Sequence, residues 1–149
     1  MQEKELTPKQ LLLLRAKIKK PFELTVDGVS MLPVLHPGDS ITICAKDEYS
    51  VGDIVVFFYK NDELLVHRLL KIDKGRYFCK GDNSFRLEDV DSSALIGSVL
   101  LDADPNNTPE FISASYAVSR VFRRCGYDVE KVKTTPEYIE YKEKYLCPR

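Results

Sequence analysis

The sequence has no pair of cysteines in a CxxC arrangement and no apolar run longer than six residues. Its longest apolar runs, Leu11–Leu14 and Ile54–Tyr59, fall far short of the ~20 residues that a membrane-spanning helix needs. The N-terminal stretch has acidic residues before its leucines and basic ones after them, the reverse of a secretory signal peptide. We therefore expect no stable membrane insertion and a cytoplasmic location.

Histidine is scarce as well, with only His36 and His67 in the chain. The four cysteines are Cys44, Cys79, Cys125 and Cys147. Such scattered ligands do not form a zinc motif, so we expect no metal and no cofactor, and reduced cysteines. The net charge of −1 gives no reason to expect nucleic acid as a partner.

The length of 149 residues fits one domain, which helix-like and strand-like residue patterns divide into three zones. Residues 1–21 predict an N-terminal helix, residues 22–103 a β core, and residues 104–149 a helical extension. The β zone contains the strand-like runs FELTV, SITIC, DIVVFFY, LLVHRLLKI, RYFCK and ALIGSVLL, separated by glycine and aspartate turns. The expected fold is mainly β, α+β overall, with a small curled antiparallel sheet or open barrel.

Helical patterns flank this core on both sides. Thr7 and Pro8 predict the start of a helix over residues 7–19, in which Leu11, Leu14 and Ile18 share a face that should pack on the core. After the core, one helix is expected from about Pro109 and another after residue 126. On the first of these, the apolar face should pack on the barrel, or alternatively capture a leader peptide or dock at a membrane interface. Its members are Phe111, Ala114, Val118, Val121 and Phe122.

Three polar residues stand in places where chemistry could occur. Ser30 lies between Gly28 and Pro33, where a sharp bend can expose a hydroxyl and leave N–H groups free for an oxyanion. His67 interrupts an apolar strand, and Asp82 lies in the turn KGDNS. Taken singly, each of the three has an ordinary structural interpretation.

Together, six blocks in order resemble the type I signal peptidases and the LexA-like self-cleaving repressors. The blocks are SMLP, PGD, GDIVVF, LVHRLL, KGDN and LIGSVLL, from about Val26 to Val99. The resemblance implies a peptidase with Ser30 as nucleophile and the residue at position 67 as base. Most bacterial members have lysine there, whereas His67 resembles the archaeal and endoplasmic-reticulum branch. Histidine, whose reference pKa is near ~6.5, can accept a proton at neutral pH without strong burial.

The resemblance also implies an acidic residue that orients the histidine. Asp82 is the first choice and Asp89 the second, with Glu88 beside it. Gly28 and Met31 are the expected oxyanion or substrate-binding residues, because glycine stands where many signal peptidases have a serine donor.

Three further residues near these blocks have simpler interpretations. Arg68 and Asp39 match family positions and are interpreted as structural, Arg68 by pairing with a carboxylate and Asp39 by tying a turn. His36 falls outside the family pattern.

The sequence thus predicts a serine-type endopeptidase that removes a leader or signal-like segment from a peptide or protein precursor. The alternative is a catalytically degenerate peptidase fold that serves as a binding or regulatory module. A DNA-binding repressor is disfavoured, because the segment before the core is short for a helix-turn-helix unit. Moreover, the Cys-Gly pair at Cys125 lies after the core rather than before it. Neither the oligomeric state nor the cleaved bond follows from the sequence.

Overall fold

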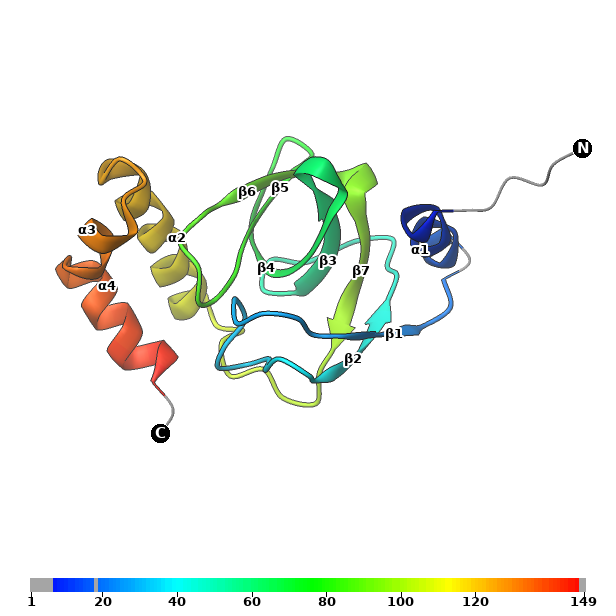
Figure 1. The fold of residues 1–149 in the computed structure, drawn as a ribbon, viewed down its shortest axis with the longest axis horizontal. Helices are drawn as coiled ribbons and strands as arrows, with labels where there is room; N and C mark the ends of the chain where they lie inside the picture. The colour runs from blue at the N-terminus through cyan, green and yellow to red at the C-terminus, as the bar shows by residue number, and fades with distance from the viewer. Residues whose placement is uncertain (1–6, 18, 148–149) are drawn as a thin grey trace, which may run out of the picture.

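A computed structural model of the chain describes residues 7–17 and 19–147. Seven antiparallel strands form one curled sheet, an open half-barrel with helices at either end (Figure 1). The strands are β1 (Phe22–Thr25), β2 (Ser40–Cys44), β3 (Ile54–Tyr59), β4 (Glu63–Asp73), β5 (Arg76–Lys80), β6 (Glu88–Asp91) and β7 (Leu95–Leu100). The predicted fold class is confirmed.

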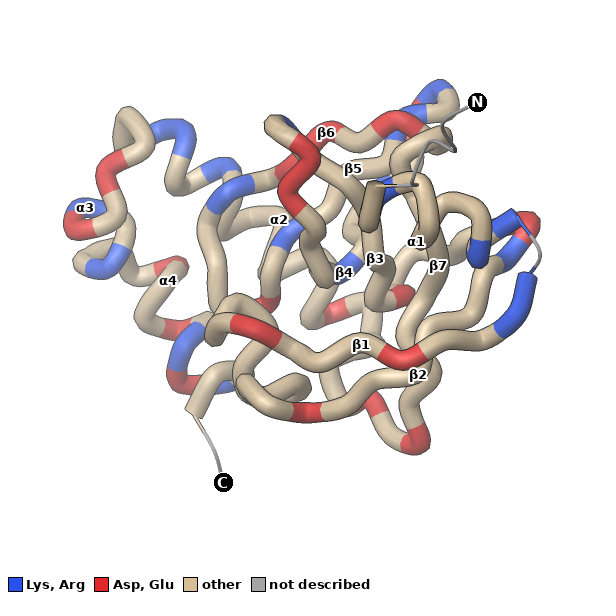
Figure 2. Tube along the Cα trace, turned by 45° about the vertical axis from the view of Figure 1, so that its right-hand side comes forward, with Lys and Arg blue, Asp and Glu red and all other residues tan. Residues whose placement is uncertain are grey.

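The helices are α1 (Pro8–Lys17), α2 (Pro109–Arg124), α3 (Val129–Lys133) and α4 (Pro136–Tyr141), and the last continues into a π-helical segment, Lys142–Leu146. Single 3₁₀ turns precede β4 and β7. Acidic and basic positions alternate along the coloured part of the trace, on the helices as well as on the sheet (Figure 2). Within the described ranges, no helix combines the length and the apolar character that crossing a bilayer requires.

The strand order is β1-β2-β7-β3-β4-β5-β6, so β1 and β6 are the two edges of the sheet. All six predicted strands are present, but the sequence patterns predicted no strand at the position of β6. Its sequence, EDVD, contains three acidic residues, which are depleted in strands. It forms a strand because it pairs with β5 from Arg76 to Cys79. This omission matters for the site, because β6 begins with Glu88.

The central strand β3 supplies side chains to two separate cores, since successive residues of a strand point to opposite faces. Ile54, Val56 and Phe58 join one apolar cluster, and Val55 and Phe57 join the other. All five are buried. Burial on both faces explains why this segment reads as a continuous apolar run rather than an alternating one.

Helix α1 packs on the first of these clusters, but through a different face from the predicted one. Leu12, Leu13 and Ala16 lie against the cluster, whereas Leu11 and Leu14 remain 47% and 48% exposed. The expectation that Leu11 and Leu14 face the core is therefore wrong. The third predicted member of that face, Ile18, lies outside the described residues.

Helix α2 begins at Pro109, as predicted, with the Thr108 hydroxyl accepting a hydrogen bond from the Phe111 N–H at 3.1 Å. The predicted apolar face is buried, but mostly against α3 and α4 rather than against the barrel. Its contacts with the barrel include the Phe111 ring, which lies 5.4 Å from the Arg68 guanidinium of β4, and the Ser115 hydroxyl, which accepts a hydrogen bond from Lys80 of β5 at 2.9 Å. The C-terminal helices therefore form a small core of their own beside the sheet.

Candidate active site

Ser30 lies in a turn that follows β1. Gly28 adopts φ +85°, a conformation that favours glycine, and brings the chain out of the strand. The next residues form a tight turn in which the Leu35 N–H donates to the Met31 carbonyl at 2.9 Å. The Ser30 side chain is part-buried and lies at the wall of a cleft.

His67 reaches this serine from β4. Its Nε2 lies 3.1 Å from the Ser30 Oγ, although the two residues are 37 positions apart in sequence. The residue is only 5% exposed, and its imidazole packs edge-on against the Phe57 ring, with 6.2 Å between the ring centres. The structure therefore brings together the two residues that the resemblance pairs, at hydrogen-bond distance.

Glu88 completes this arrangement. Its Oε1 lies 2.5 Å from the His67 Nδ1, and its Oε2 accepts a hydrogen bond from the Arg86 Nε at 3.3 Å. The carboxyl group is fully buried. A carboxylate at Nδ1 holds the proton on that nitrogen, and the lone pair of Nε2 then faces the serine hydroxyl.

The Asp82 carboxylate, the first choice for the acid, does not contact His67 in the structure. Its carboxylate binds the Arg68 guanidinium in a bidentate pair, with both distances 2.9 Å, and both side chains are completely buried. Arg68 also binds Asp104 and the Gly52 carbonyl. Burial alone lowers the pKa of Arg68, but the hydrogen bonds with Asp82 and Asp104 outweigh it and the net shift is upward. The carboxylate that contacts His67 in the structure is that of Glu88.

Asp89, the second choice, points away from the site. It is exposed and binds Arg76 at 2.8 Å. The reason is strand alternation: in β6 the burial pattern places Glu88 and Val90 inside and the residues between them outside. The alternation signal was present in EDVD, since Val90 identifies the inward face and Glu88 shares it.

The remaining polar residues near these motifs are structural. The Asp39 carboxylate accepts a hydrogen bond from the His36 N–H at 2.9 Å and ties the turn, as expected. The His36 imidazole is exposed and lies 3.8 Å from Asp39, away from Ser30 and His67.

Burial raises the pKa of the Cys79 thiol, with a further contribution from the Glu88 charge, and this thiol stays protonated. Among the described residues, no cluster of three or more His, Cys, Asp and Glu could hold a metal.

The turn after β5 holds the serine loop in place. The Asn83 N–H donates to the Ser30 carbonyl at 2.8 Å, and the Asn83 side chain donates to the Val29 carbonyl at 3.1 Å. The Asp82 N–H lies 3.4 Å from the Met31 sulfur. Gly81 passes so close that a Cβ there would lie 2.7 Å from the Ser30 carbonyl oxygen. The sequence KGDN is thus a clamp on the loop, and its Asp82 carboxylate contacts Arg68 rather than His67.

Two backbone donors are available beside the Ser30 hydroxyl. Within the described part of the chain, the N–H groups of Ser30 and Met31 make no hydrogen bond. The Met31 side chain is buried and its thioether carries no N–H or O–H, so only the Met31 backbone can serve as a donor. Gly28 has open space around its Cα and contributes conformation rather than contact.

The cleft beside the dyad has a volume of about 270 Å³ and lies between β1 and the first half of β4. Both strands present an unpaired edge to it. Among the residues that the structure describes, β1 pairs only with β2, and β4 pairs with β5 only from Arg68 onward, which leaves Glu63–His67 unpaired on that side. Leu24, Leu64 and Val66 contribute an apolar lining. An extended peptide can add to such edges through its backbone.

A curled antiparallel sheet with a serine and a histidine at hydrogen-bond distance is the arrangement expected for a serine peptidase-type hydrolase. The chain belongs to the Peptidase S24-like family, whose profile matches residues 2–100. This match supports the LexA and signal-peptidase superfamily expected from the sequence blocks. No curated protein sequence matches the chain significantly. The matched range ends before α2, so the C-terminal helices lie beyond it.

Proposed function

We propose that this protein is a serine endopeptidase of the His-base branch, in which Ser30 is the nucleophile, His67 the general base and Glu88 the orienting carboxylate. The observation that carries the proposal is the continuous chain of contacts from Ser30 Oγ to His67 Nε2 and from Nδ1 to Glu88. A binding module has no need of this alignment. Retention of all three groups therefore favours catalysis over a degenerate fold.

The reaction follows from these positions. The Ser30 hydroxyl attacks the scissile carbonyl carbon while His67 Nε2 takes its proton, and Glu88 stabilises the imidazolium. The N–H groups of Ser30 and Met31 face the oxyanion. Collapse of the tetrahedral intermediate breaks the C–N bond, and His67 returns the proton to the leaving amine. A water molecule, deprotonated by the same histidine, then hydrolyses the acyl-serine ester and releases a carboxylic acid.

The substrate we propose is a peptide or protein precursor, from which a leader or signal-like segment is removed. The unpaired edges of β1 and β4 suit an extended chain on both of its sides. The cleft is small and lined by Leu64, Val66 and Met31, so small apolar side chains should fit on the acyl side of the cut bond. Profiling with a peptide library and mass spectrometry tests this preference. Dominance of large or charged residues at that position would contradict it.

A cytoplasmic setting is part of the proposal. All four cysteines are free in the structure, which fits a reducing compartment. Fractionation of native cells tests the location. Recovery in a membrane pellet that resists high salt and carbonate would contradict it.

The catalytic role is tested by labelling with a fluorophosphonate probe, which reacts with activated serines. The wild-type protein should label, and Ser30→Ala and His67→Gln should not. Ser40→Ala is the matched control, because Ser40 is an exposed residue at the start of β2 and should leave labelling intact. If the wild-type protein does not label while it remains folded by circular dichroism, the degenerate binding module is the better description.

A further inference from the structure

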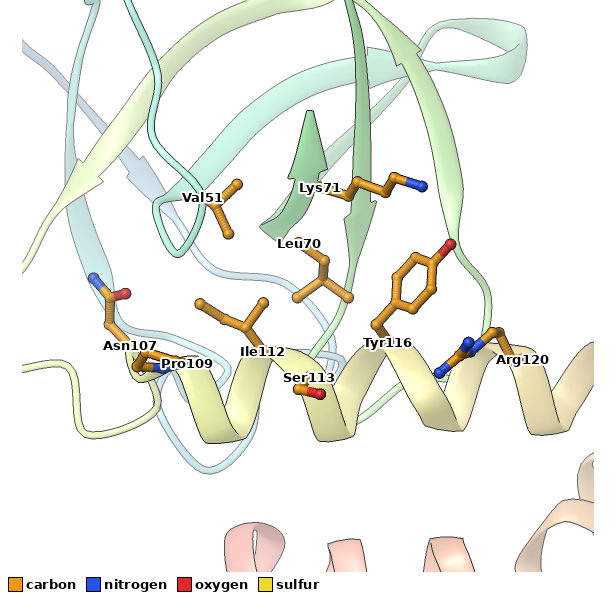
Figure 3. A pocket seen from close by; sticks show the side chains of 9 residues that line it. All are labelled: Val51, Leu70, Lys71, Asn107, Pro109, Ile112, Ser113, Tyr116 and Arg120. Carbon is orange, nitrogen blue, oxygen red and sulfur yellow. The ribbon is translucent and has the colours of Figure 1, made fainter. Parts of the chain in front are cut away.

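A hollow that shares no lining residue with the cleft at Ser30 lies between α2 and the outer end of β4 (Figure 3). Its volume is about 600 Å³. Val51, Leu70 and Ile112 form an apolar floor, and the side chains of Lys71 and Arg120 stand at one end. An apolar floor beside charged groups is typical of a binding site rather than of a packing defect.

Helix α2 supplies one side of this hollow through a regular stripe. Ile112, Tyr116 and Arg120 follow each other at intervals of four residues and therefore lie on the same face of the helix. This face is distinct from the one that carries Phe111 and Val118 into the C-terminal core. Two faces of α2 thus have different partners, and the stripe is the one left open.

Two cations lie close to a single aromatic ring in this stripe. The Lys71 Nζ is 5.7 Å, and the Arg120 guanidinium 5.2 Å, from the centre of the Tyr116 ring. Across residues 7–17 and 19–147, neither cation forms an ion pair, and no Asp or Glu lines the hollow. Two like charges held at one ring repel each other, and an anion between them would relieve this repulsion.

The basic lining continues past Tyr116. A second hollow of about 220 Å³ shares Tyr116 and Arg120 and adds Arg86 and Arg123, again without an acidic residue in its lining. We name the two hollows together the α2 groove. Arg86 is paired with Glu88 at 3.3 Å, so among the described residues the α2 groove presents three cations without an ion pair, Lys71, Arg120 and Arg123, and an apolar floor at one end.

We propose that the α2 groove binds an acidic peptide segment of a partner protein, with at least one large apolar side chain seated on the floor. The charges of Lys71, Arg120 and Arg123 complement carboxylates, and the floor needs an apolar group to cover it. A nucleic acid would satisfy the cations but leave the exposed Val51 and the partly exposed Ile112 uncovered. The proposal does not depend on the proposed peptidase activity.

The test is fluorescence anisotropy with a labelled synthetic peptide of alternating Asp and Glu around a central Leu-Phe pair. This peptide should bind, whereas a version with lysines in place of the acids should not. Arg120→Gln and Lys71→Gln should each weaken binding about tenfold, the effect of one charge-assisted contact. Arg124→Gln removes the same charge from the same helix, but Arg124 faces Glu137 at 3.2 Å, so binding should stay within about twofold.

The contact between the apolar floor and the Leu-Phe pair of the peptide is tested separately. Ile112→Asn should weaken binding of the peptide, and replacing the central Leu-Phe pair by Ser-Ser should do the same. Because Ile112 is partly exposed, this variant is expected to fold, which its thermal melt can verify. A single-stranded oligothymidine of equal charge serves as the competing ligand. Absence of peptide binding, tighter binding of the oligothymidine, or equal losses in Arg120→Gln and Arg124→Gln would each overturn the proposal.

Discussion

The Tyr141 hydroxyl donates a hydrogen bond to the backbone carbonyl of Asp82 at 2.5 Å, across 59 positions of sequence. This contact joins α4 to the same turn that holds the Ser30 carbonyl through the Asn83 N–H. Burial raises the pKa of Tyr141, so its hydroxyl stays protonated and remains a donor. The C-terminal helices therefore support the clamp on the serine loop, although they lie beyond the range of the family match.

Replacing Tyr141 by phenylalanine should lower both stability and turnover. The buried Asp82 carbonyl loses its partner, which should reduce the free energy of unfolding by about 1–2 kcal/mol. The looser turn should reduce kcat more than it raises KM. Urea unfolding and steady-state kinetics measure the two effects. Tyr138→Phe is the control, because Tyr138 packs in the same apolar cluster and its hydroxyl makes no hydrogen bond within the described residues. Equal behaviour of the two variants would contradict the role of this bond.

Glu88→Gln should reduce kcat/KM by a factor of about 10²–10⁴ with little change in fold. An amide in place of the carboxylate can donate to Nδ1 and so favours the tautomer in which Nε2 carries the proton, which leaves no base for Ser30. The control is Asp89→Asn, which changes the adjacent exposed residue of β6 and should keep wild-type activity. A larger loss in the Asp89 variant would mean that the register of β6 differs from that in the structure.

Asp82→Asn should act mainly on stability. Arg68 is completely buried and would keep only Asp104 as a charged partner, so the free energy of unfolding should fall by about 3 kcal/mol. Any activity that remains should show the wild-type pH profile, because Asp82 does not contact His67. Denaturant unfolding and a pH–rate profile measure this. A changed profile at unchanged stability would restore Asp82 to the role that the sequence suggested.

The sequence was sufficient to predict the β core, because strand and turn patterns alternate clearly. It was also sufficient to predict that Ser30 and His67 lie together, because the motif blocks occur in order. It was insufficient to identify the acid that contacts His67 because no strand was predicted over EDVD. Without a strand at that place, no face could be assigned, and Glu88 had no advantage over Asp89. Pairing with β5 decides the matter, and such pairing depends on tertiary structure rather than on local propensity.

The contacts between the C-terminal extension and the sheet were also not predicted from the sequence. Nothing near Tyr141 in sequence indicates that its hydroxyl reaches Asp82, and nothing near Asp104 indicates that it shares Arg68. Both contacts depend on where the C-terminal extension folds back on the sheet. Its helices could be predicted from their caps and apolar spacing, but their docking position could not.

Gly81→Ala should reduce activity by about 10²-fold through a small displacement of the dyad. An added Cβ would lie 2.7 Å from the Ser30 carbonyl oxygen and 3.1 Å from the His67 Nε2, so the loop or the ring must move. Steady-state kinetics measure the loss. Gly75→Asn is the control, because Gly75 has a positive φ that asparagine tolerates and open space for a side chain. Full activity of the Gly81 variant would show that the serine loop moves without consequence.

Lys80 provides a test based on pH. It is completely buried, and its ammonium group donates to Ser115 and to the Gly81 carbonyl. Burial lowers the pKa of Lys80 from 10.5 to about 7, against opposing contributions from the Asp82 and Glu88 charges. The unfolded chain therefore holds this proton over a range of pH in which the folded chain has released it.

The sign of the effect follows from linkage. Between about pH 7 and about pH 10.5 the unfolded state binds more protons, so the free energy of unfolding should rise with pH, by up to about 1.4 kcal/mol per unit. Below about pH 7 both states are protonated, and the cost of the buried charge is fully present.

Urea unfolding of the wild type and of Lys80→Met between about pH 7 and about pH 10.5 gives a difference in the free energy of unfolding that isolates the lysine, and this difference should rise with pH. Lys71→Met removes an exposed lysine from the adjacent strand and should give a flat difference. A flat curve for Lys80→Met as well would mean that the Asp82 and Glu88 charges keep Lys80 protonated inside the fold, and that the buried cluster beside the clamp carries a permanent positive charge.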